Sequence, residues 1–424
     1  MNNIPVDPMN EPPSSVTCAV VDAYGAGRLL PPALRRYGVD HVHVRSPFPD
    51  TKLAYCPEDF TVEFQHDGDV RRTAERLRQH GVGIVVAAAE SGVLLANELS
   101  AALGTPGNGM RHPEARRDKY AMHKAVREAG LAAADSITST SADEILAWAE
   151  ARGPWPVVLK PPSSAGTDNV IFCDSAEAVV AAHRKIAAGI DRYGRGNPTV
   201  LAQQFLAGEE HYVNTVSRDG VHRVIEIWHY YKRPVPGGRS INDYEDLLPP
   251  DDPGGSRVAA YVLDVLDALE IRNGAAHTEV MLTDDGPVLV ECGARIGGGQ
   301  LPDVLSRCVG TNQVESLALS IARPEEFLRR AREPYRLHSR LRCVNLISET
   351  DGVVPSGAGW DTVRSLASFA GLVMNLPEGG PAPQTVDLAT CPGAVYLASD
   401  DPAVIEADTL RLRALERSGL YAGG

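Results

Sequence analysis

The sequence lacks long apolar runs, paired cysteines and an excess of positive charge. No apolar stretch approaches the ~20 residues that span a bilayer, and the seven cysteines are scattered, without a C-x-x-C pair. Scattered cysteines predict reduced, packed thiols and disfavour a zinc site. The net charge of −14 argues against a nucleic-acid-binding surface. We therefore expect a cytoplasmic globular protein without nucleic-acid or membrane partners.

The chain length limits the number of lobes, and the first residues indicate how the N-terminus is organised. The 424 residues predict roughly two to four lobes, and the sequence contains no internal repeat. Residues 1–15 are polar and rich in proline, and they lack the basic and apolar regions of a signal peptide. We expect a disordered tail over these residues and no signal peptide.

Residues 16–110 alternate between predicted strands and helices. The segments 16–22, 39–45 and 81–90 read as strands, and helical segments lie between and after them. This alternation predicts an α/β lobe with a small doubly wound parallel sheet. The YGAG turn after the first strand does not match G-x-G-x-x-G, so its glycines serve the turn better than a dinucleotide. Glu90 ends the third strand, where side chains of such sheets often touch substrate.

A hairpin is predicted near residue 284. Two apolar strands at 276–282 and 286–293 are joined by Asp284-Asp285-Gly286, which is a strong turn signal. Glu279 and Glu291 interrupt these strands and can lie side by side on them. Two converging carboxylates suit a hard cation such as Mg²⁺. An ordinary hairpin with solvated acids explains the same pattern equally well.

Three features surround the hairpin acids. Arg295 follows Glu291 by four residues, and Gly297–Gly299 come next, where the backbone can approach a ligand closely. His277 lies two residues before Glu279, so strand alternation places both on one face. His277 is either a substrate contact or a packed structural histidine.

Two lysines are candidates for phosphate contacts. Lys160 ends a predicted strand and precedes the loop 161–169, which is rich in small and hydroxyl residues whose backbone N–H groups can surround phosphates. The loop is not a Walker A motif, and a plain hairpin with a polar loop is the alternative. Lys119 lies in a basic segment predicted as a helix over 111–130, where a solvated lysine is the simpler interpretation.

Residues 203–210 form a candidate hinge. The backbone edge from Gln203 to Leu206 can pair with adenine, and Glu209 or Glu210 can hold ribose hydroxyls. A strand with exposed acids is the alternative. Further on, residues 235–255 read as a long loop rich in glycine and proline, of the functional or mobile kind.

The last part of the chain changes its pattern. Residues 323–335 read as a polar connector. Short strands and a final amphipathic helix over 336–424 predict a small α+β lobe.

Together these elements resemble the ATP-grasp superfamily. The resemblance rests on Lys119 in RDKYAM, Lys160 before SSAGTDN, the hinge QQFLAGEE and the hairpin HTEVML…VLVECGAR, in that order. Within the superfamily the sequence looks like the L-amino acid ligase branch, which makes dipeptides and related amides. The segments AESGVLLANELSAALGTPGN, RRDKYAMHKAVREAG, ECGARIGGG and TVDLATCPGAVYLAS carry that resemblance across most of the chain.

The resemblance implies an ATP-grasp fold of mixed α/β and α+β type. Its expected parts are a pre-ATP-grasp α/β domain at 16–110, an ATP-grasp domain at 111–335 with a lid at about 155–212, and a C-terminal α+β domain at 336–424. It also implies an ADP-forming ligase that joins small-molecule carboxylates to amines through an acyl phosphate. The cofactors would be ATP and Mg²⁺, with Mn²⁺ as a substitute.

The resemblance also assigns roles to residues. Arg295 and Lys160 would be catalytic, and Glu279 and Glu291 would bind the metal. ATP would be bound by the following residues: Lys119, Lys160, Ser163, Ser164, Ala165, Gly166, Gln203 or Gln204, Phe205, Leu206 and Glu210. The substrates would contact the following residues: Glu90, Lys232, Arg233, His277, Arg295 and Gly298.

Two positions depart from the family pattern. Many members have Asn two residues after the second metal-binding Glu, whereas this chain has Gly293, so either one or two Mg²⁺ ions fit the sequence. The hinge begins with Gln where many members have Glu, and its side-chain carbonyl can still accept from the adenine amino group.

Two other functions were weighed. One is a carboxylase or formyl-phosphate enzyme of purine-like metabolism, although no biotin-carrier motif is present. The other is a non-catalytic nucleotide-binding protein. The sequence leaves open the acyl donor and amine acceptor, whether a substrate is carrier-bound, whether the pathway belongs to secondary metabolism, and whether the chain forms a homodimer.

Overall fold

The computed structural model describes residues 16–49, 53–153, 155–164, 169–191, 194, 196–235, 239–299 and 301–422. The expected tail at 1–15 and residues 165–168 of the expected phosphate loop, which include Ala165 and Gly166, lie outside the described residues. In the described part, none of the helices has the length and apolar character that crossing a membrane requires. All seven cysteines are free thiols, and six of them are buried, as expected.

The first sheet is parallel, with strand order β3-β2-β1-β4. The expected doubly wound lobe is therefore confirmed. Sequence analysis missed β3, which is only three residues long. The elements of this lobe are β1 (Thr17–Val21), α1 (Leu30–Arg36), β2 (Asp40–Arg45), β3 (Glu63–Gln65), α2 (Val70–Gln79), β4 (Val82–Ala87) and α3 (Val93–Leu103).

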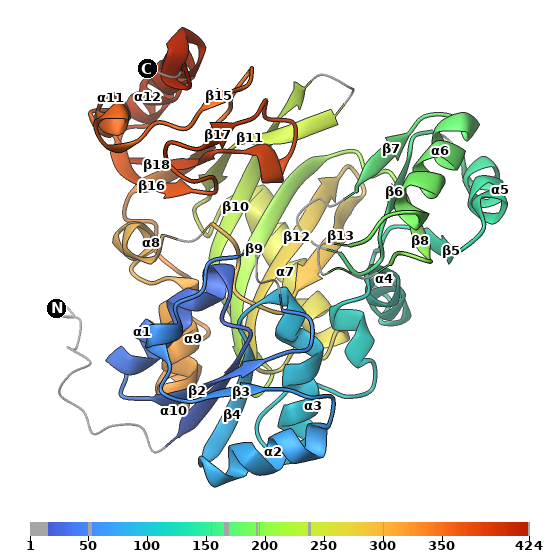
Figure 1. The fold of residues 1–424 in the computed structure, drawn as a ribbon, viewed down its shortest axis with the longest axis vertical. Coiled ribbons are helices and arrows are strands. Elements are labelled where there is room, and N and C mark those ends of the chain that lie inside the picture. The colour runs from blue at the N-terminus through green and yellow to red at the C-terminus, as the bar shows by residue number, and fades with distance from the viewer. Residues whose placement is uncertain are drawn as a thin grey trace.

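An eight-stranded antiparallel sheet forms the centre of the molecule (Figure 1), in the order β13-β12-β9-β10-β11-β14-β18-β16. Its strands are β9 (Glu209–Arg218), β10 (Val221–Val235), β11 (Arg239–Leu247), β12 (Gly274–Thr283), β13 (Gly286–Gly293), β14 (Arg340–Asn345), β16 (Phe369–Met374) and β18 (Gly393–Ser399). The predicted hairpin is confirmed as β12 and β13. The C-terminal strands β14, β16 and β18 continue this sheet instead of forming one of their own.

Two sequence-based expectations about this region were wrong. The segment 235–255 is not a single long loop, because β11 pairs with β10 along most of its length. The residues of β11 are mostly polar and lack the apolar alternation of a half-buried strand, and glycines and prolines flank them. The connector at 323–335 contains α10 (Pro324–Arg330), whose Phe327 is fully buried in the core beside the first lobe.

Helices cover the central sheet and link it to the first lobe. They are α7 (Pro253–Ala268), α8 (Pro302–Val309) and α9 (Gln313–Ala322), while α11 (Asp361–Arg364), α12 (Pro402–Leu415) and a two-stranded ribbon of β15 (Gly352–Val353) and β17 (Pro381–Ala382) complete the C-terminal part. The helix α7 begins with Pro253 behind Asp252, whose side chain accepts from the backbone N–H of Gly255.

A second four-stranded sheet is antiparallel, in the order β5-β8-β6-β7. Its elements are β5 (Ser136–Ser139), α5 (Ala142–Arg152), β6 (Val157–Lys160), β7 (Ile171–Cys173), α6 (Ala176–Ala187) and β8 (Val200–Gln204). Leu159 and Ala202 pack under α5 and α6 on one face. Lys160 and Gln203 alternate with them and lie on the other face.

The predicted helix over 111–130 is interrupted. A short 3-10 turn covers Pro113–Arg116, and α4 (Lys119–Glu128) begins after Asp118, whose carboxylate caps the backbone N–H of Ala121. Lys119 is only 6% exposed, so its interpretation as a solvated surface lysine was wrong.

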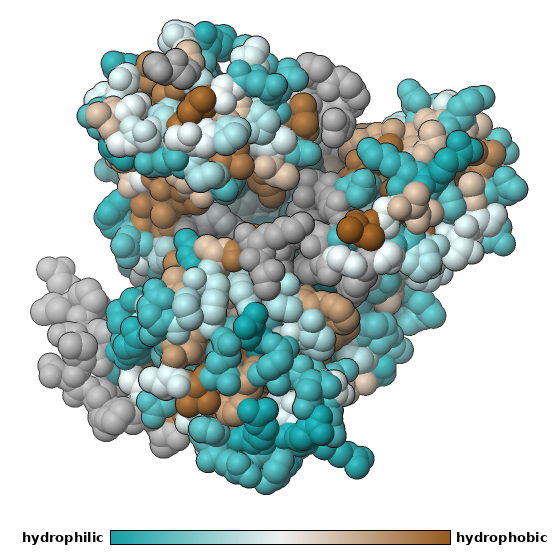
Figure 2. Space-filling view, viewed as in Figure 1, coloured by the Kyte–Doolittle hydropathy of each residue, from teal (hydrophilic) through white to brown (hydrophobic). Residues whose placement is uncertain are grey.

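The surface is hollowed where these parts meet. In the space-filling view, a depression lies between the first lobe, the C-terminal elements and the second sheet (Figure 2). The hairpin β12–β13 reaches toward this region from the central sheet (Figure 1).

Candidate active site

The two hairpin acids face each other across the strands. Glu279 of β12 pairs in register with Glu291 of β13, so their side chains share one face. Burial alone would raise the pKa of Glu279, but the hydrogen bond and charge of His277, with further cations, lower it to about 2. Nζ of Lys119 lies 3.1 Å from Oε2 of Glu291. Each carboxylate therefore already has a cationic or hydrogen-bonding partner.

Hydrogen bonds join the start of α4 to the loop after β6. The backbone N–H of Lys119 donates to the carbonyl of Pro162 at 2.9 Å, and its Nζ donates to the carbonyl of Ser164 at 2.6 Å. Arg117 donates from Nη2 to the carbonyl of Ser163 at 2.8 Å. The loop expected to surround phosphates therefore lies against Lys119, and Lys119 contacts Glu291.

Lys160 and Gln203 lie on the face of the second sheet that looks toward α4. Burial, and then the positive charge of Lys119, lower the pKa of Lys160 to about 8. The side-chain amide of Gln203 lies 3.5 Å from Nε2 of His123, a buried residue of α4. Gln204 lies on the opposite face, where its side-chain oxygen accepts from the backbone N–H of Asp135. The structure thus separates the two glutamines that the sequence could not distinguish.

The hinge continues beyond β8. Phe205 is 39% exposed and packs edge-on against Phe172 of β7, with ring centroids 5.9 Å apart; Leu206 follows it. Glu210 is the second residue of β9 in the central sheet, and its Oε2 accepts from Nζ of Lys232 at 2.5 Å. Burial raises the pKa of Glu210 in spite of this lysine.

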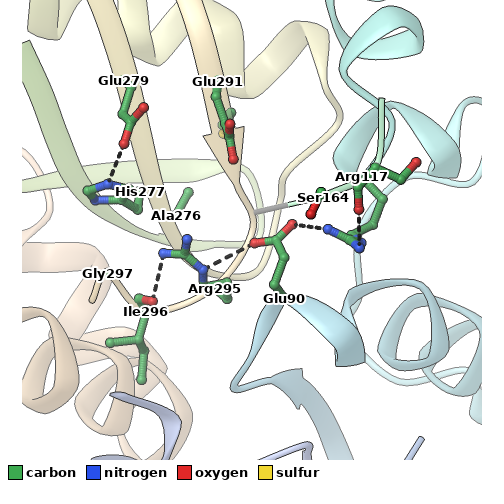
Figure 3. Close-up of polar contacts among 12 residues, drawn as sticks. Glu90, Arg117, Ser164, Ala276, His277, Glu279, Glu291, Arg295, Ile296 and Gly297 are labelled. Carbon is green, nitrogen blue, oxygen red and sulfur yellow. Dashed lines mark hydrogen bonds and ion pairs between the residues drawn. The ribbon is translucent and has the colours of Figure 1, made fainter. Parts of the chain in front are cut away.

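Glu90 joins the first lobe to the hairpin end. Its Oε1 accepts from Nη1 of Arg117 at 2.8 Å and its Oε2 accepts from Nε of Arg295 at 3.1 Å (Figure 3). Burial would raise the pKa of Glu90, but the two arginines outweigh it and lower the pKa. A Cβ on Gly293 would lie 3.0 Å from Oε2 of Glu90 and 3.2 Å from Cζ of Arg295. Gly293 therefore leaves room for this ion pair.

The glycine run after Arg295 is fixed at both ends. The backbone N–H of Gly297 donates to Oε1 of Gln313, and the carbonyl of Gly299 accepts from the hydroxyl of Tyr396. Between them Gly298 is exposed, and no heavy atom of the described residues lies within 4 Å of a Cβ built on it. The backbone at Gly298 is thus open to approach.

One expected substrate contact lies apart from this cluster. Nε of Arg233 lies 3.3 Å from Oδ1 of Asp243, which also accepts from Arg413 of α12. Arg233 is therefore linked to α12 through Asp243 of β11, whereas its neighbour Lys232 contacts Glu210.

Sequence analysis missed the buried Asn214 and Glu226 behind His277, and the half-buried Glu245. Nδ1 of His277 lies 2.8 Å from Oδ1 of Asn214, and Nδ2 of Asn214 donates to Oε1 of Glu226 at 2.7 Å. Glu245 of β11 accepts from the hydroxyl of Tyr212 at 2.9 Å, and burial raises its pKa to about 7. Arg117 was missed as well. The position of Arg117 two residues before Lys119 was its only signal, since the partners of all these residues come from distant segments of the chain.

Sequence similarity to known proteins identifies the family of this chain. Over 413 residues the chain is 32% identical to dapdiamide A synthase of Enterobacter agglomerans, and the match covers 95% of this chain and 96% of that protein. The chain belongs to the ATP-grasp superfamily, in its amino acid ligase branch. This ATP-grasp ligase is also 24% identical to the L-arginine-specific L-amino acid ligase of Bacillus subtilis over 241 residues, which is 56% of this chain and 58% of that protein.

A solved structure shares the ATP-grasp fold. The L-amino acid ligase from Bacillus licheniformis matches with a TM-score of 0.72 at 18% identity, covering 95% of this chain and 98% of that one. No protein-family model matches the chain. Membership of the amino acid ligase branch makes this chain an ADP-forming carbon–nitrogen ligase that forms amide or peptide bonds with ATP. The two other functions weighed above are not better supported.

Proposed function

We propose that this ATP-grasp ligase activates a small carboxylate as an acyl phosphate and joins it to the amino group of an amino acid or related amine. The observation that carries the proposal is the convergence of Glu279, Glu291, Lys119 and the Glu90–Arg295 ion pair at one end of the hairpin. This convergence brings anion-binding and cation-binding groups together beside the loop after β6.

The chemistry explains why such a mixture of charges is needed. A carboxylate is a poor acyl donor because its leaving group would be oxide. Attack of a carboxylate oxygen on the γ-phosphorus breaks the bond to the β–γ bridging oxygen and releases ADP. The amine nitrogen then attacks the acyl carbon, phosphate leaves, and the ammonium proton is lost to solvent. Acyl phosphates hydrolyse, so a closed phosphate loop protects the intermediate from water.

Glu279 and Glu291 would hold Mg²⁺, or Mn²⁺ in its place. The fit is supported by two carboxylates in direct register, with the ammonium of Lys119 and the imidazole of His277 already at cation-compatible positions beside them. When bound, the metal would supply positive charge that reduces repulsion between the phosphates and the attacking carboxylate. Gly293 supplies no ligand, which favours a single protein-held ion.

ATP would contact both lysines and the hinge. Lys119 and Lys160 would meet the phosphates as cations, together with the backbone of Ser163 and Ser164 and with Ala165 and Gly166. Gln203, rather than Gln204, would accept from the adenine amino group beside the backbone of Phe205 and Leu206. Glu210 would hold the ribose hydroxyls after exchanging Lys232 for them.

Arg295 would neutralise the negative charge that develops on the acyl oxygen. The substrates would lie between Glu90, His277, Lys232 and the open backbone at Gly298. Dapdiamide A synthase and the L-arginine-specific ligase are named for a specialised amide and for an amino acid, so both substrate classes are candidates for this chain.

The test is an ADP-release screen with pairs of amino acids and with specialised carboxylates, followed by mass spectrometry of the products. ADP release that needs both a carboxylate and an amine, and that is lost in Glu291→Ala, supports the proposal. Bicarbonate-dependent release, or near-normal turnover of Glu291→Ala, contradicts it. Failure with every pair of free amino acids, but not with specialised carboxylates, assigns the acyl donor to the second class.

A further inference from the structure

A second group of metal-ligating side chains lies on the other face of the central sheet. Glu209 and His211 alternate along β9 with Glu210 and Tyr212, so they point away from the candidate active site. His229 of β10 is directly opposite His211 in the register of the two strands. One possible ligand atom from each of the residues Glu209, His211 and His229 lies within 4.8 Å of the other two.

The two imidazoles lie against each other. The rings of His211 and His229 stack with centroids 4.5 Å apart and planes 8° apart. His229 also packs on Tyr231 at 4.3 Å, and Tyr231 stacks on Tyr244 at 4.5 Å. Arg342 lies over the far side of Tyr244. These rings form a row across three strands that ends at the half-buried His229 and the buried His211.

A hydrogen bond fixes the tautomer of His211. Its Nδ1 lies 3.1 Å from the backbone carbonyl of Glu209. A carbonyl only accepts, so Nδ1 carries the proton and Nε2 keeps its lone pair. Metal-bound histidines in proteins are typically oriented by this kind of bond from the other ring nitrogen.

The side chains around this cluster are negatively charged, and the cluster is accessible from solvent. His211 is buried, His229 is half-buried and Glu209 is exposed, so the cluster opens to solvent on one side. Asp252, at the start of α7, lies on the same side: its Oδ2 and Nε2 of His211 are 3.5 Å and 3.9 Å from the position of a Cβ on Gly254. The negative charge of these carboxylates favours a bound cation.

We infer that Glu209, His211 and His229 bind one borderline transition-metal ion, with Zn²⁺ as the natural probe. Two imidazoles and a carboxylate suit such an ion and do not suit Mg²⁺, which prefers oxygen ligands. Ligand atoms in a tetrahedral zinc site are about 3.3 Å apart. Stacked rings direct their in-plane lone pairs in parallel, so the half-buried ring of His229 turns out of the stack and the exposed Glu209 side chain rotates to meet an ion held by Nε2 of His211. The expectation against a zinc site rested on the scattered cysteines, which bear on thiolate ligands and not on two imidazoles and a carboxylate.

The inference does not depend on the ligase chemistry, and its test separates the two metal sites. The full chain carrying Glu291→Gln, which weakens the hairpin site, is stripped with a chelator and titrated with Zn²⁺ by calorimetry. We expect one equivalent to bind. Adding His229→Gln or Glu209→Gln should weaken binding at least about tenfold, since even changes behind a metal ligand cost 10- to 100-fold. Co²⁺ should give visible absorption bands that the same changes remove.

His222→Gln is the matched control, because His222 lies on the same strand with other partners, Ser217 and Asp267. Zn²⁺ binding that resists His229→Gln, or that is absent from the Glu291→Gln chain, overturns the inference. If His229→Gln does not fold, the change at the exposed Glu209 decides the question alone.

Discussion

The guanidinium of Arg295 occupies the space that a side chain at position 293 would need. A Cβ built on Gly293 comes within 3.2 Å of Cζ of Arg295 and within 3.0 Å of Oε2 of Glu90. The departure of this chain from the expected asparagine therefore has a structural reason. The space that would hold an amide ligand is used for an ion pair between the first lobe and the hairpin.

Gly293→Asn should displace Arg295 and lower kcat by roughly 10²- to 10³-fold, the usual effect of losing one group that stabilises developing charge. KM for ATP should change much less, because the residues proposed to contact the phosphates lie elsewhere. Steady-state kinetics at saturating substrates measures both. The control is Gly196→Ala, where a Cβ meets no described atom within 4 Å. An unchanged kcat in Gly293→Asn would show that the Arg295–Glu90 pair is not needed.

Arg117→Met should impair both ATP binding and turnover. Arg117 holds the carbonyl of Ser163 in the phosphate loop and also Oε1 of Glu90. Its loss leaves a buried carboxylate with one cation fewer and releases the loop, so we expect KM for ATP to rise and kcat to fall, each by about tenfold or more. Arg111→Met is the control, since Arg111 is 70% exposed in its pair with Glu270. Equal kinetics for the two variants would contradict the linking role.

Gln203→Ala and Gln204→Ala should differ in their effect on KM for ATP. Gln203 faces α4 and the candidate nucleotide site, whereas Gln204 lies on the opposite face of the second sheet, which α5 and α6 cover. Removing one hydrogen bond worth about 0.5–1.5 kcal/mol should raise KM for ATP roughly 2- to 10-fold in Gln203→Ala. Gln204→Ala should leave it unchanged. A competition assay with GTP adds a second readout, because only the Gln203 change should reduce the preference for adenine.

Lys160 should make ATP capture sensitive to pH. Its pKa is lowered to about 8, so the unliganded enzyme loses the ammonium charge as pH rises through that value. We expect kcat/KM for ATP to fall above about pH 8, while kcat at saturating ATP falls only at higher pH because bound phosphates favour the charged lysine. Lys160→Arg should flatten the profile, and Lys124→Arg, at an exposed site, should not. A constant kcat/KM between pH 7 and pH 9.5 would contradict this role.

Deprotonation of Glu245 should lower the free energy of unfolding as pH rises. Its pKa is raised from 4.5 to about 7 by burial, so the folded state binds more protons than the unfolded state between these values. The free energy of unfolding therefore falls as pH rises through this window, by up to about 3 kcal/mol from this group. Urea unfolding at pH 5 and pH 8 should show a smaller loss for Glu245→Gln than for the unmodified chain. Glu98→Gln, exposed on α3, should behave like the unmodified chain.

Local patterns were enough for the parts that depend on neighbours in the sequence. The hairpin with Glu279 opposite Glu291 followed from alternation and the turn Asp284-Asp285-Gly286, and the register agrees. The parallel sheet of the first lobe followed from alternating strands and helices. The strand β11 was missed because its ladder partners, β10 and β14, outweigh the loop-like composition around it.

Long-range contacts were the part that the sequence alone could not provide. The burial of Lys119 depends on the loop at Pro162 and on Glu291, which are 43 and 172 residues further along the chain. The partners of Glu90, the separation of Gln203 from Gln204, and the pairing of His211 with His229 likewise depend on how strands from different segments align. Residue type made these positions candidates, and tertiary packing decided which of them meet.

The contact between Lys119 and Glu291 has a consequence for the order of ligand entry. A divalent ion that arrived alone would take Glu291 and leave a buried ammonium without its anion. A nucleotide that arrived alone would take Lys119 and leave a carboxylate facing its phosphates. Only a complex of the two exchanges both partners in one event, so each ligand should strengthen the binding of the other by the same factor. The Lys119–Glu291 ion pair thus favours binding of the metal–nucleotide complex over binding of either ligand alone.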